Sequence, residues 1–351
     1  MKLASLPRVR LAHLPTPLHE LSNLSRALQG PRIFVKRDDL TGLALGGNKT
    51  RKLEYIMAEA VEQKADTIVT GAAFHSNWCT QAAAAARRLG MRAVLIKTAP
   101  SENYDPEDYD GNHLLHFLMG AEMKIVRIED FPKVQQETME DLKRKGHRPF
   151  LLEATGSTPR GAAGYVHGVL ELLSQSAEMG IHFDYLIHTS GSGGTQAGLI
   201  LGAKAFQADL RIIASTSGSR KQKEQVANVW NHIQEAQKFL NLDVRVSPDD
   251  VVVYDQYAGE GYGFMTEGRA EAIRLMAELE GIFLDPVYTS SAVACLIDLC
   301  RKGFFKSSDH VVFLHTGGAA ALFPYKAPLK AYGLKKSPPW TVPPWSYTLK
   351  Q

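Results

Sequence analysis

Apolar and polar positions alternate along this chain in a way that predicts short buried strands separated by amphipathic helices. From about residue 51 onward, short apolar runs lie between longer stretches with helical periodicity. Strands separated by helices of this length favour parallel sheets with right-handed crossovers. The first block is expected to contain helix 51–64, strand 67–70, helix 77–89, strand 93–97, helix 111–120, strand 124–128, helix 134–145 and strand 149–152.

A second block of the same kind follows, and an irregular arm precedes both. The arm, residues 1–31, is expected to end in a short helix over 18–28, and a strand over 32–38 comes next. The second block is expected to contain helix 162–176, strand 185–189, helix 195–205, strand 211–215, helix 221–240, strand 251–254, helix 266–279, a short apolar turn at 282–284, helix 291–302 and strand 310–315.

Two alternating blocks predict an α/β protein with two lobes, each an open, mainly parallel sheet flanked by helices. We expect residues 51–165 to form a smaller, mobile domain and residues 1–50 with 166–351 to form a larger one. The proline- and tryptophan-rich tail from Lys335 to Gln351 is expected to pack as an extended strap, and a partner subunit is one candidate for the surface it covers.

Composition narrows the class of protein. Hydrophobic residues make up 44% of the chain and charged residues 22%, which is typical of globular proteins. The net charge of +3 is spread out, with no basic run interleaved with aromatics, so nucleic acid is not an expected partner. There is no apolar segment long enough for a leader or a membrane span, so we expect a cytoplasmic protein with no membrane partner.

Cysteine and histidine spacing gives no sign of a disulfide framework or a metal site. The three cysteines, Cys79, Cys295 and Cys300, lack C-x-x-C spacing, and the twelve histidines do not form an H-E-x-x-H pattern. We therefore expect no metal.

Two glycine-rich stretches indicate a cofactor. Gly46 and Gly47 free the backbone just before Lys49, so the chain can hold this amine at a loop tip over a ligand. Residues 190–198 follow an apolar strand and open a helix, where backbone N–H groups and the macrodipole favour a phosphate. Gln196 stands where a dinucleotide fingerprint needs its third glycine. A reactive amine with one phosphate cradle indicates pyridoxal phosphate, which the larger domain is expected to hold.

Several further loops are expected beside these two. Ligands of open parallel sheets bind at the carboxyl ends of the strands. Five glycine- or serine-rich loops have this location, namely 71–77, 156–161, 191–194, 215–219 and 315–318. Their convergence would form a single site.

The same segments carry a resemblance to a known family. They are G-G-N-K-T-R-K-L-E at 46–54, Ser76-Asn77, Gly111-Asn112 with Leu114-Leu115, G-A-E at 120–122, G-T-Q-A-G at 194–198, D-P-V-Y at 285–288 and H-T-G-G at 315–318. In this order, over nearly the whole chain, they resemble the D-cysteine desulfhydrase and 1-aminocyclopropane-1-carboxylate deaminase family. The resemblance implies the tryptophan-synthase-β-like fold (fold type II of pyridoxal phosphate enzymes) and a homodimer.

The resemblance also implies a role for each matching residue. Catalysis would fall to Lys49, which forms the Schiff base and then moves the proton, to Ser76, which with nearby backbone N–H groups receives the substrate carboxylate, and to Tyr262 and Tyr288, which flank the reacting centre. The cofactor would be held by Lys49, by Asn77 at the ring hydroxyl, and at the phosphate by Lys52, Gly191, Ser192, Gly193, Gly194 and Thr195. Burial beside Arg51 and Lys52 is expected to lower the pKa of Lys49.

Residue 289 bears on the type of reaction. In this family the position faces the pyridine nitrogen, and it is a glutamate in the deaminases but Thr289 here, as in the desulfhydrases. A hydroxyl can only hydrogen-bond the nitrogen, so expulsion of a β leaving group is favoured over ring opening of a cyclopropane. We expect α,β-elimination from a small amino acid, with D-cysteine, yielding pyruvate, sulfide and ammonia, as the leading substrate.

This chain departs from the family pattern near the expected substrate. His75 stands where glutamine is typical, and Trp78 follows Ser76-Asn77 in place of histidine or glutamine. Both could alter the substrate wall or pack behind it. Gly156 begins a loop containing Arg160, which would bind an anionic side chain such as the sulfonate of cysteate if it points inward, and would be an ordinary surface residue if it points outward.

Other functions stay open from the sequence alone. L-Cysteate sulfo-lyase and 1-aminocyclopropane-1-carboxylate deaminase are alternatives within the family. A nucleotide-binding oxidoreductase that uses the 191–198 turn belongs to another class, and Gln196 counts against it. A non-catalytic homologue is a third alternative, although Lys49, Asn77, Tyr262 and Tyr288 argue for activity.

Overall fold

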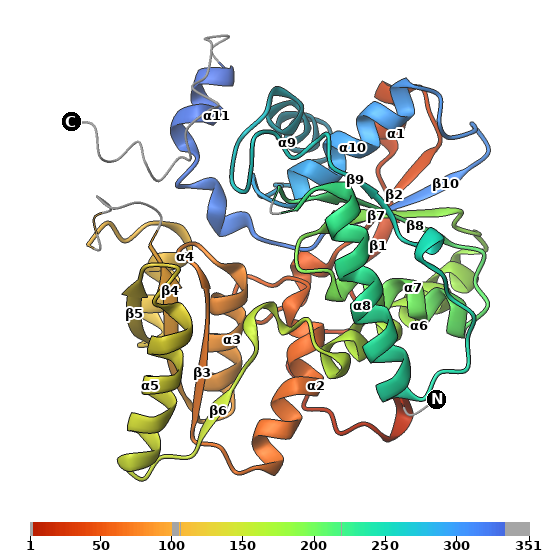
Figure 1. Cartoon of the computed structure of the whole chain (residues 1–351). Helices are drawn as coiled ribbons and strands as arrows, with labels where there is room; N and C mark the ends of the chain where they lie inside the picture. Colours follow the sequence, from red (N-terminus) through yellow and green to blue (C-terminus); the bar gives the residue numbers. More distant parts are fainter. Residues whose placement is uncertain (1–2, 100–104, 106, 219, 334–351) are drawn as a thin grey trace.

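The computed structural model describes residues 3–99, 105, 107–218 and 220–333, and it shows two sheets, each flanked by helices (Figure 1). The α/β class and the two mainly parallel sheets predicted from the sequence are confirmed. The expected strap over 335–351 lies outside the described residues. No helix in the described part of the chain is long and apolar enough to cross a membrane.

The larger sheet has six strands in the order β1-β2-β10-β7-β8-β9. All neighbouring strands are parallel except β1 and β2, which run antiparallel at one edge. The strands are β1 (Leu18–Glu20), β2 (Arg32–Lys36), β7 (Tyr185–Ser190), β8 (Arg211–Thr216), β9 (Val252–Tyr254) and β10 (His310–Leu314).

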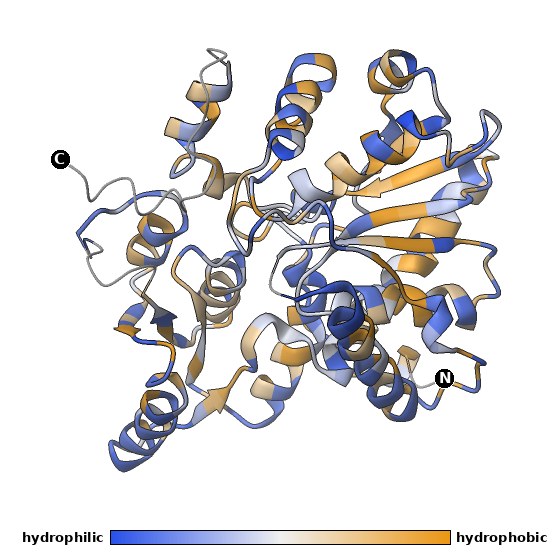
Figure 2. Cartoon of the chain, turned by 45° about the horizontal axis from the view of Figure 1, so that its top comes forward, coloured by the Kyte–Doolittle hydropathy of each residue, from blue (hydrophilic) through white to orange (hydrophobic). Residues whose placement is uncertain are grey.

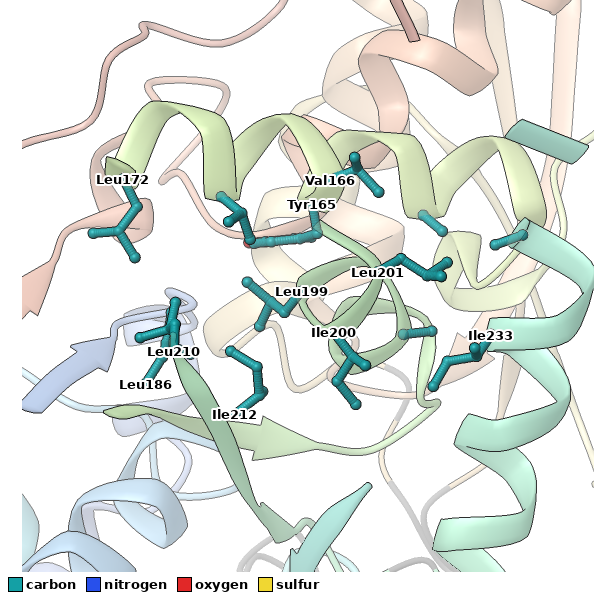
Figure 3. Close-up of a cluster of buried hydrophobic side chains, with 14 of the residues drawn as sticks. Tyr165, Val166, Leu172, Leu186, Leu199, Ile200, Leu201, Leu210, Ile212 and Ile233 are labelled. Carbon is teal, nitrogen blue, oxygen red and sulfur yellow. The ribbon is translucent and has the colours of Figure 1, made fainter. Parts of the chain in front are cut away.

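Helices cover both faces of this sheet because successive strand residues point to opposite sides. Leu186 packs in the cluster with α6, α7 and α8, whereas Ile187 packs in the cluster with α1, α9 and α10. Figure 3 shows the first cluster between α6, α7 and the strands, and Figure 2 shows the hydrophobic colouring of the strands themselves. The helices are α1 (Ser22–Leu28), α6 (Pro159–Met179), α7 (Gly194–Ala205), α8 (Gln222–Leu240), α9 (Glu267–Glu280) and α10 (Thr289–Arg301).

The smaller sheet has four parallel strands in the order β5-β4-β3-β6. The strands are β3 (Thr67–Ala73), β4 (Arg92–Thr98), β5 (Glu122–Val126) and β6 (Pro149–Leu151). Helices α2 and α3 pack on one face and α5 on the other. The helices of this part of the chain are α2 (Lys49–Glu62), α3 (Asn77–Arg88), α4 (Gly111–Leu118) and α5 (Phe131–Arg144). Helix α11 (Lys326–Gly333) comes after β10, the last strand of the larger sheet, in the sequence.

Two local expectations at the N-terminal side need correction. The helix expected over 18–28 begins only at Ser22, because Leu18–Glu20 pair with Phe34–Lys36 as β1. The helical pattern over 18–28 does not reveal this pairing, because the partner strand lies outside that segment. Lys49 is the first residue of α2 rather than a loop-tip residue. The predicted domain boundaries at 50/51 and 165/166 fall inside α2 and α6, and the division itself stays a prediction.

A buried ion network ties α2 to the larger sheet. Arg51 donates two hydrogen bonds of 2.8 Å to the carboxylate of Asp38, which follows β2, and two of 2.8 and 2.9 Å to Glu171 of α6. Tyr165 donates to Asp38 at 2.7 Å. Burial alone would raise the pKa of Asp38, but the charge and hydrogen bonds of Arg51 outweigh it and lower the pKa. The network therefore stabilises the fold above the ordinary carboxyl pKa and loses this contribution in acid.

We expect Asp38→Ala to lower the free energy of unfolding by about 3–5 kcal/mol, because it leaves the buried Arg51 charge incompletely paired. Glu20→Ala is the matched control, since Glu20 and Arg32 form an exposed ion pair at 2.7 Å, and it should cost less than about 1 kcal/mol. Urea unfolding of the two variants measures both values. Equal losses would contradict the assignment of the network as a structural anchor.

Candidate active site

A cavity of about 470 Å³ lies at the carboxyl ends of strands from both sheets. Residues from all five glycine- or serine-rich loops line it, including Ala72, Ser157, Gly191, Ser217 and Thr316. The predicted site residues that line it are Lys49, Ser76, Asn77, Trp78, Gly191, Ser192, Gly193, Thr195, Tyr262 and Tyr288. The topology thus brings together side chains that are as far apart in the sequence as Lys49 and Thr316.

Backbone close to Lys49 fixes where its amine lies. Gly47 has φ +134°, and a Cβ there would lie 2.5 Å from Nε2 of Gln81 and 3.0 Å from the carbonyl oxygen of Thr316. Only glycine fits this approach without displacing its neighbours. The N–H of Asn48 donates to the same Thr316 carbonyl at 3.1 Å. The 46–48 turn is therefore clamped against the loop that follows β10, and α2 begins with Lys49 facing the cavity.

The amine of Lys49 is tuned for chemistry at neutral pH. Burial lowers its pKa to about 8, because the ammonium form loses hydration. Arg51, also expected to lower this pKa, has its guanidinium neutralised by Asp38 and Glu171. Burial is the cause of the shift, and Arg51 serves as an anchor.

The other end of the cavity is a cradle for an anion. The turn 190–193 leads into α7, whose first residue is Gly194, and Gly193 takes φ +92°. A Cβ at Gly193 would lie 2.6 Å from Nδ2 of Asn228. The amide of Asn228 donates to the carbonyl of Ser192 at 3.1 Å, which fixes the turn. Backbone N–H groups at the start of α7 consequently face the cavity.

Lys52 supplies a cation to this cradle. Its side chain is fully buried, and Nζ donates to Oγ of Ser157 at 3.3 Å. Ser157 also meets Oγ of Ser192 at 2.7 Å and receives the N–H of Gly194 at 3.3 Å. Burial and the neighbouring charge of Lys49 lower the pKa of Lys52 well below its ordinary value.

The charges of Lys49 and Lys52 and the donors at the start of α7 show whether the cavity suits an aldehyde that carries a phosphate. Among the described residues, neither Lys49 nor Lys52 forms an ion pair with a carboxylate, although Lys52 is fully buried, Lys49 is half-buried at the cavity, and the charge of Lys49 acts on Lys52. A phosphate at the α7 cradle would relieve their repulsion and accept the backbone donors. The set of donors and the free amine therefore fit pyridoxal phosphate, with Lys52, Ser157 and the 191–195 turn at its phosphate.

Asn77 is held in one orientation by Asn112, a residue of the Gly111-Asn112 motif for which the sequence alone predicts no role in the site. Asn112 donates from Nδ2 to Oδ1 of Asn77 at 2.8 Å and to the carbonyl of His75 at 3.0 Å. Thr80 donates to Oδ1 of Asn112 at 2.8 Å, which fixes the Asn112 amide in turn. Because its oxygen is occupied, Asn77 presents its NH₂ group as a donor. The predicted contact with the cofactor's ring hydroxyl requires such a group.

Two tyrosines, Tyr262 and Tyr288, form part of the cavity wall. The hydroxyls of Tyr262 and Tyr288 lie 2.7 Å apart, with the rings edge to face. Burial raises the pKa of Tyr262 to about 12 and that of Tyr288 well above its usual value, so both stay protonated at neutral pH.

At the start of α3, Ser76 caps the helix by accepting the N–H of Cys79 at 3.3 Å, and this helix N-terminus suits a carboxylate.

Thr289 lies behind the wall, outside the residues that line the cavity. It is buried, and its hydroxyl donates to Oδ1 of Asp285 at 2.8 Å while accepting the Asp285 N–H at 2.7 Å. The carboxylate of Asp285 also accepts the N–H groups of Val287, Tyr288 and Thr289. The only hydroxyl proton of Thr289 is therefore already committed to Asp285.

Of the six residues expected at the substrate, Ser76 and Asn77 line the cavity, and the other four are divided between the cavity and its surroundings. Trp78 lines the cavity, with its indole N–H bonded to Thr70 at 2.8 Å. Gly156 lies behind Trp78, where a Cβ would approach its ring to 2.8 Å. His75 lines a neighbouring cavity. Arg160 pairs with Glu59 of α2 at 2.9 Å and is not among the lining residues, so its predicted contact with an anionic side chain has no support in this geometry.

A two-lobed α/β scaffold with a buried amine at the start of one helix and a phosphate cradle at the start of another defines a pyridoxal-phosphate-dependent enzyme of fold type II. Comparisons with known proteins agree. A family model described as pyridoxal-phosphate dependent enzyme matches residues 9–317. The chain belongs to this family and, within it, to the D-cysteine desulfhydrase and 1-aminocyclopropane-1-carboxylate deaminase group.

The relatives that support this placement cover nearly the whole chain. A D-cysteine desulfhydrase of Yersinia enterocolitica is 42% identical, over 92% of this chain and 97% of its own. A 1-aminocyclopropane-1-carboxylate deaminase of Burkholderia multivorans is 40% identical, over 93% of this chain and 98% of its own. The solved structure of a deaminase homologue is 38% identical, with a TM-score of 0.85 over 94% of this chain and 97% of that one.

The pKa of Lys49 leads to a prediction about cofactor uptake. The amine must lose its proton before it can bond to an aldehyde. With a pKa of about 8, the rate at which apoprotein takes up pyridoxal phosphate covalently should rise about tenfold per pH unit below 8 and level off above it. Absorbance of the bound cofactor follows the rate. A rise that continues up to the pKa of an ordinary lysine would show that Lys49 is not buried as described.

Asn112→Asp tests the orientation of Asn77. The substitution replaces a donor by an acceptor of the same size, so the Asn77 amide should turn its NH₂ group toward the new carboxylate and away from the cavity. We expect the dissociation constant of pyridoxal phosphate to rise about tenfold. Asn23→Asp is the matched control at an exposed amide, and it should leave this constant unchanged. Equal affinities in the two variants would contradict the role of Asn112.

Proposed function

We propose that this lyase catalyses α,β-elimination from a small amino acid with a leaving group on Cβ, with D-cysteine as substrate and pyruvate, sulfide and ammonia as products. The observation that supports elimination most strongly is the composition of the cavity wall. Among the described lining residues there is no aspartate or glutamate. The nearby carboxylate of Asp285 is occupied by backbone N–H groups and by Thr289.

The lack of a carboxylate among the described lining residues affects how strongly the cofactor can withdraw electrons. Bound pyridoxal phosphate supplies an electron sink for negative charge that develops on Cα of the substrate. A carboxylate at the ring nitrogen would keep this nitrogen protonated and strengthen the sink. Thr289, the residue that the family resemblance places at this nitrogen, lies outside the described lining residues here, and its hydroxyl proton is committed to Asp285. The weaker sink favours early departure of a β substituent over the longer-lived charge that opening of a cyclopropane ring requires.

The residues of the cavity provide the remaining steps. Lys49, with its lowered pKa, is the base that takes the Cα proton. Ser76 and the first N–H groups of α3 hold the substrate carboxylate. Tyr262 and Tyr288 share one hydrogen bond, so one phenol proton is used between them and the other can point to the leaving sulfur. Sulfide departs more readily when it accepts such a hydrogen bond.

The alternatives differ in how well they fit. A sulfo-lyase needs a cation for the sulfonate, but Arg160 is paired with Glu59, and Arg220 contacts the carbonyl of Gly191 at the cradle end. Cyclopropane deamination is the named activity of the Burkholderia multivorans relative and is the second candidate. The family match removes the nucleotide-binding oxidoreductase, because the 191–198 turn belongs to the pyridoxal phosphate fold. A homodimer and a cytoplasmic location remain part of the proposal.

Product analysis of the wild-type holoenzyme tests the proposal. We expect release of pyruvate and sulfide from D-cysteine at least about a hundredfold faster than release of 2-oxobutanoate from 1-aminocyclopropane-1-carboxylate, and faster than pyruvate release from L-cysteine or L-cysteate. Lys49→Ala should abolish turnover and thereby exclude a contaminating activity. A cyclopropane substrate that opens as fast as D-cysteine eliminates would refute the argument from the cavity wall.

A further inference from the structure

A second cavity, of about 190 Å³, adjoins the first near the start of α3. The two cavities share four lining residues, namely Ala73, Asn77, Tyr262 and Tyr288. Phe74 and His75, in the turn directly after β3, line only the second cavity. His75 is one of the residues at which this chain departs from the family pattern, and the elimination mechanism described above assigns it no role.

A buried lysine lies behind this cavity. Lys97, near the end of β4, is fully buried, and its Nζ lies 4.0 Å from the centre of the Phe74 ring. Nζ is also 2.5 Å from Nδ1 of His113. The rings of His75 and His113 pack against Phe74 as well, with centroids 4.9 and 4.5 Å from it. Lys97, His75 and His113 therefore surround one aromatic side chain that faces the cavity.

Lys97 brings positive charge into this cluster without a carboxylate beside it. Within the described residues, no ion pair joins Lys97 to an acidic side chain. Burial lowers its pKa to about 7, so the amine is about half protonated at pH 7, and an anion that comes close favours its charged form. Burial, reinforced by the Lys97 charge, lowers the pKa of His75 to about 3 and that of His116 well below its ordinary value, so these two imidazoles are neutral. A buried cation of this kind costs stability unless an anion comes close to it.

Lys97 is placed so that the electric field of its charge acts at the N-terminus of α3. Strands β3 and β4 pair in parallel with Lys97 opposite Ala72, which lines the main cavity. The charge of Lys97 also acts on Cys79 in the first turn of α3, and the N–H of Cys79 donates to Ser76. Helix dipole and lysine thus favour an anion at the same place, where the two cavities meet.

We propose that Lys97 is a specificity-determining residue, whose buried charge attracts the carboxylate of the amino-acid substrate to the junction of the two cavities at Ser76 and Asn77. The inference rests on the proposed function for the identity of the substrate. It adds that recognition of the carboxylate depends on a residue outside both cavity walls. Lys97 acts through its field, so its removal should weaken binding of carboxylates and spare the chemistry of Lys49.

Two small reagents separate this role from general damage to the site. Aminooxyacetate and methoxyamine both displace Lys49 from the cofactor of the holoenzyme, but only aminooxyacetate carries a carboxylate. Lys97→Met retains length and removes the charge. We expect it to slow the reaction of aminooxyacetate about tenfold and to leave that of methoxyamine within about twofold of wild type. The change in cofactor absorbance gives both rates.

Lys124→Met is the matched control. Lys124 lies on β5, next to β4, and pairs weakly with Glu122 at 3.9 Å, so neither reagent should be affected. A Lys97→Met enzyme in which both reagents slow equally, or in which neither slows, overturns the proposal. Thermal unfolding of the same variant should show an unchanged or higher midpoint, because an uncompensated buried charge has been removed.

Steady-state kinetics connect the result to turnover. With D-cysteine, Lys97→Met should raise KM about tenfold and change kcat by less than about twofold. A fall in kcat with KM unchanged contradicts an electrostatic role in binding. If wild-type enzyme does not turn over D-cysteine, the proposed function fails, while the comparison of the two reagents still decides the role of Lys97.

Discussion

The site depends on two neighbouring lysine amines of α2: Lys49, which lines a cavity whose described lining residues include no carboxylate, and Lys52, which is fully buried. Two buried ammonium groups repel each other, and each loses hydration. The protein can relieve this by releasing a proton from an amine and by binding an anion between the amines and the α7 cradle. Both responses are what a pyridoxal phosphate site needs: a nucleophilic amine at one end and a phosphate at the other.

The first turn of α2 places its three basic residues, Lys49, Arg51 and Lys52, on two sides of the helix, where they have different contacts. Lys49 and Lys52 are three residues apart in α2 and so lie on the same face of the helix. Arg51 points to another side, where it meets Asp38 and Glu171. The helix start that carries the reactive amine is thereby held to the larger sheet through an ion network, while its other face packs against α3 of the smaller one. Fixing the helix start also fixes the reach of Lys49.

Much of this arrangement was predictable from the sequence, because periodicity and glycine-rich loops report local structure. The alternating elements, the convergence of the five loops and the position of Lys49 at the cavity followed from such patterns. Residues whose role depends on where a side chain points were not predictable in this way. Thr289 turns toward Asp285, Arg160 toward Glu59, and Ser157 toward Lys52. β1 was missed since a strand of three residues is defined by its partner rather than by its own pattern.

The central claim, that one amine reaches the aldehyde of a cofactor whose phosphate lies at the α7 cradle, can be measured directly. Holoprotein would be reduced with borohydride, digested, and mapped by mass spectrometry, with Lys52→Met reduced in parallel. The account predicts a pyridoxyl group on Lys49 alone, and much lower labelling in the variant at limiting cofactor because the phosphate loses its cation. Labelling on another lysine, or none on Lys49, would contradict it.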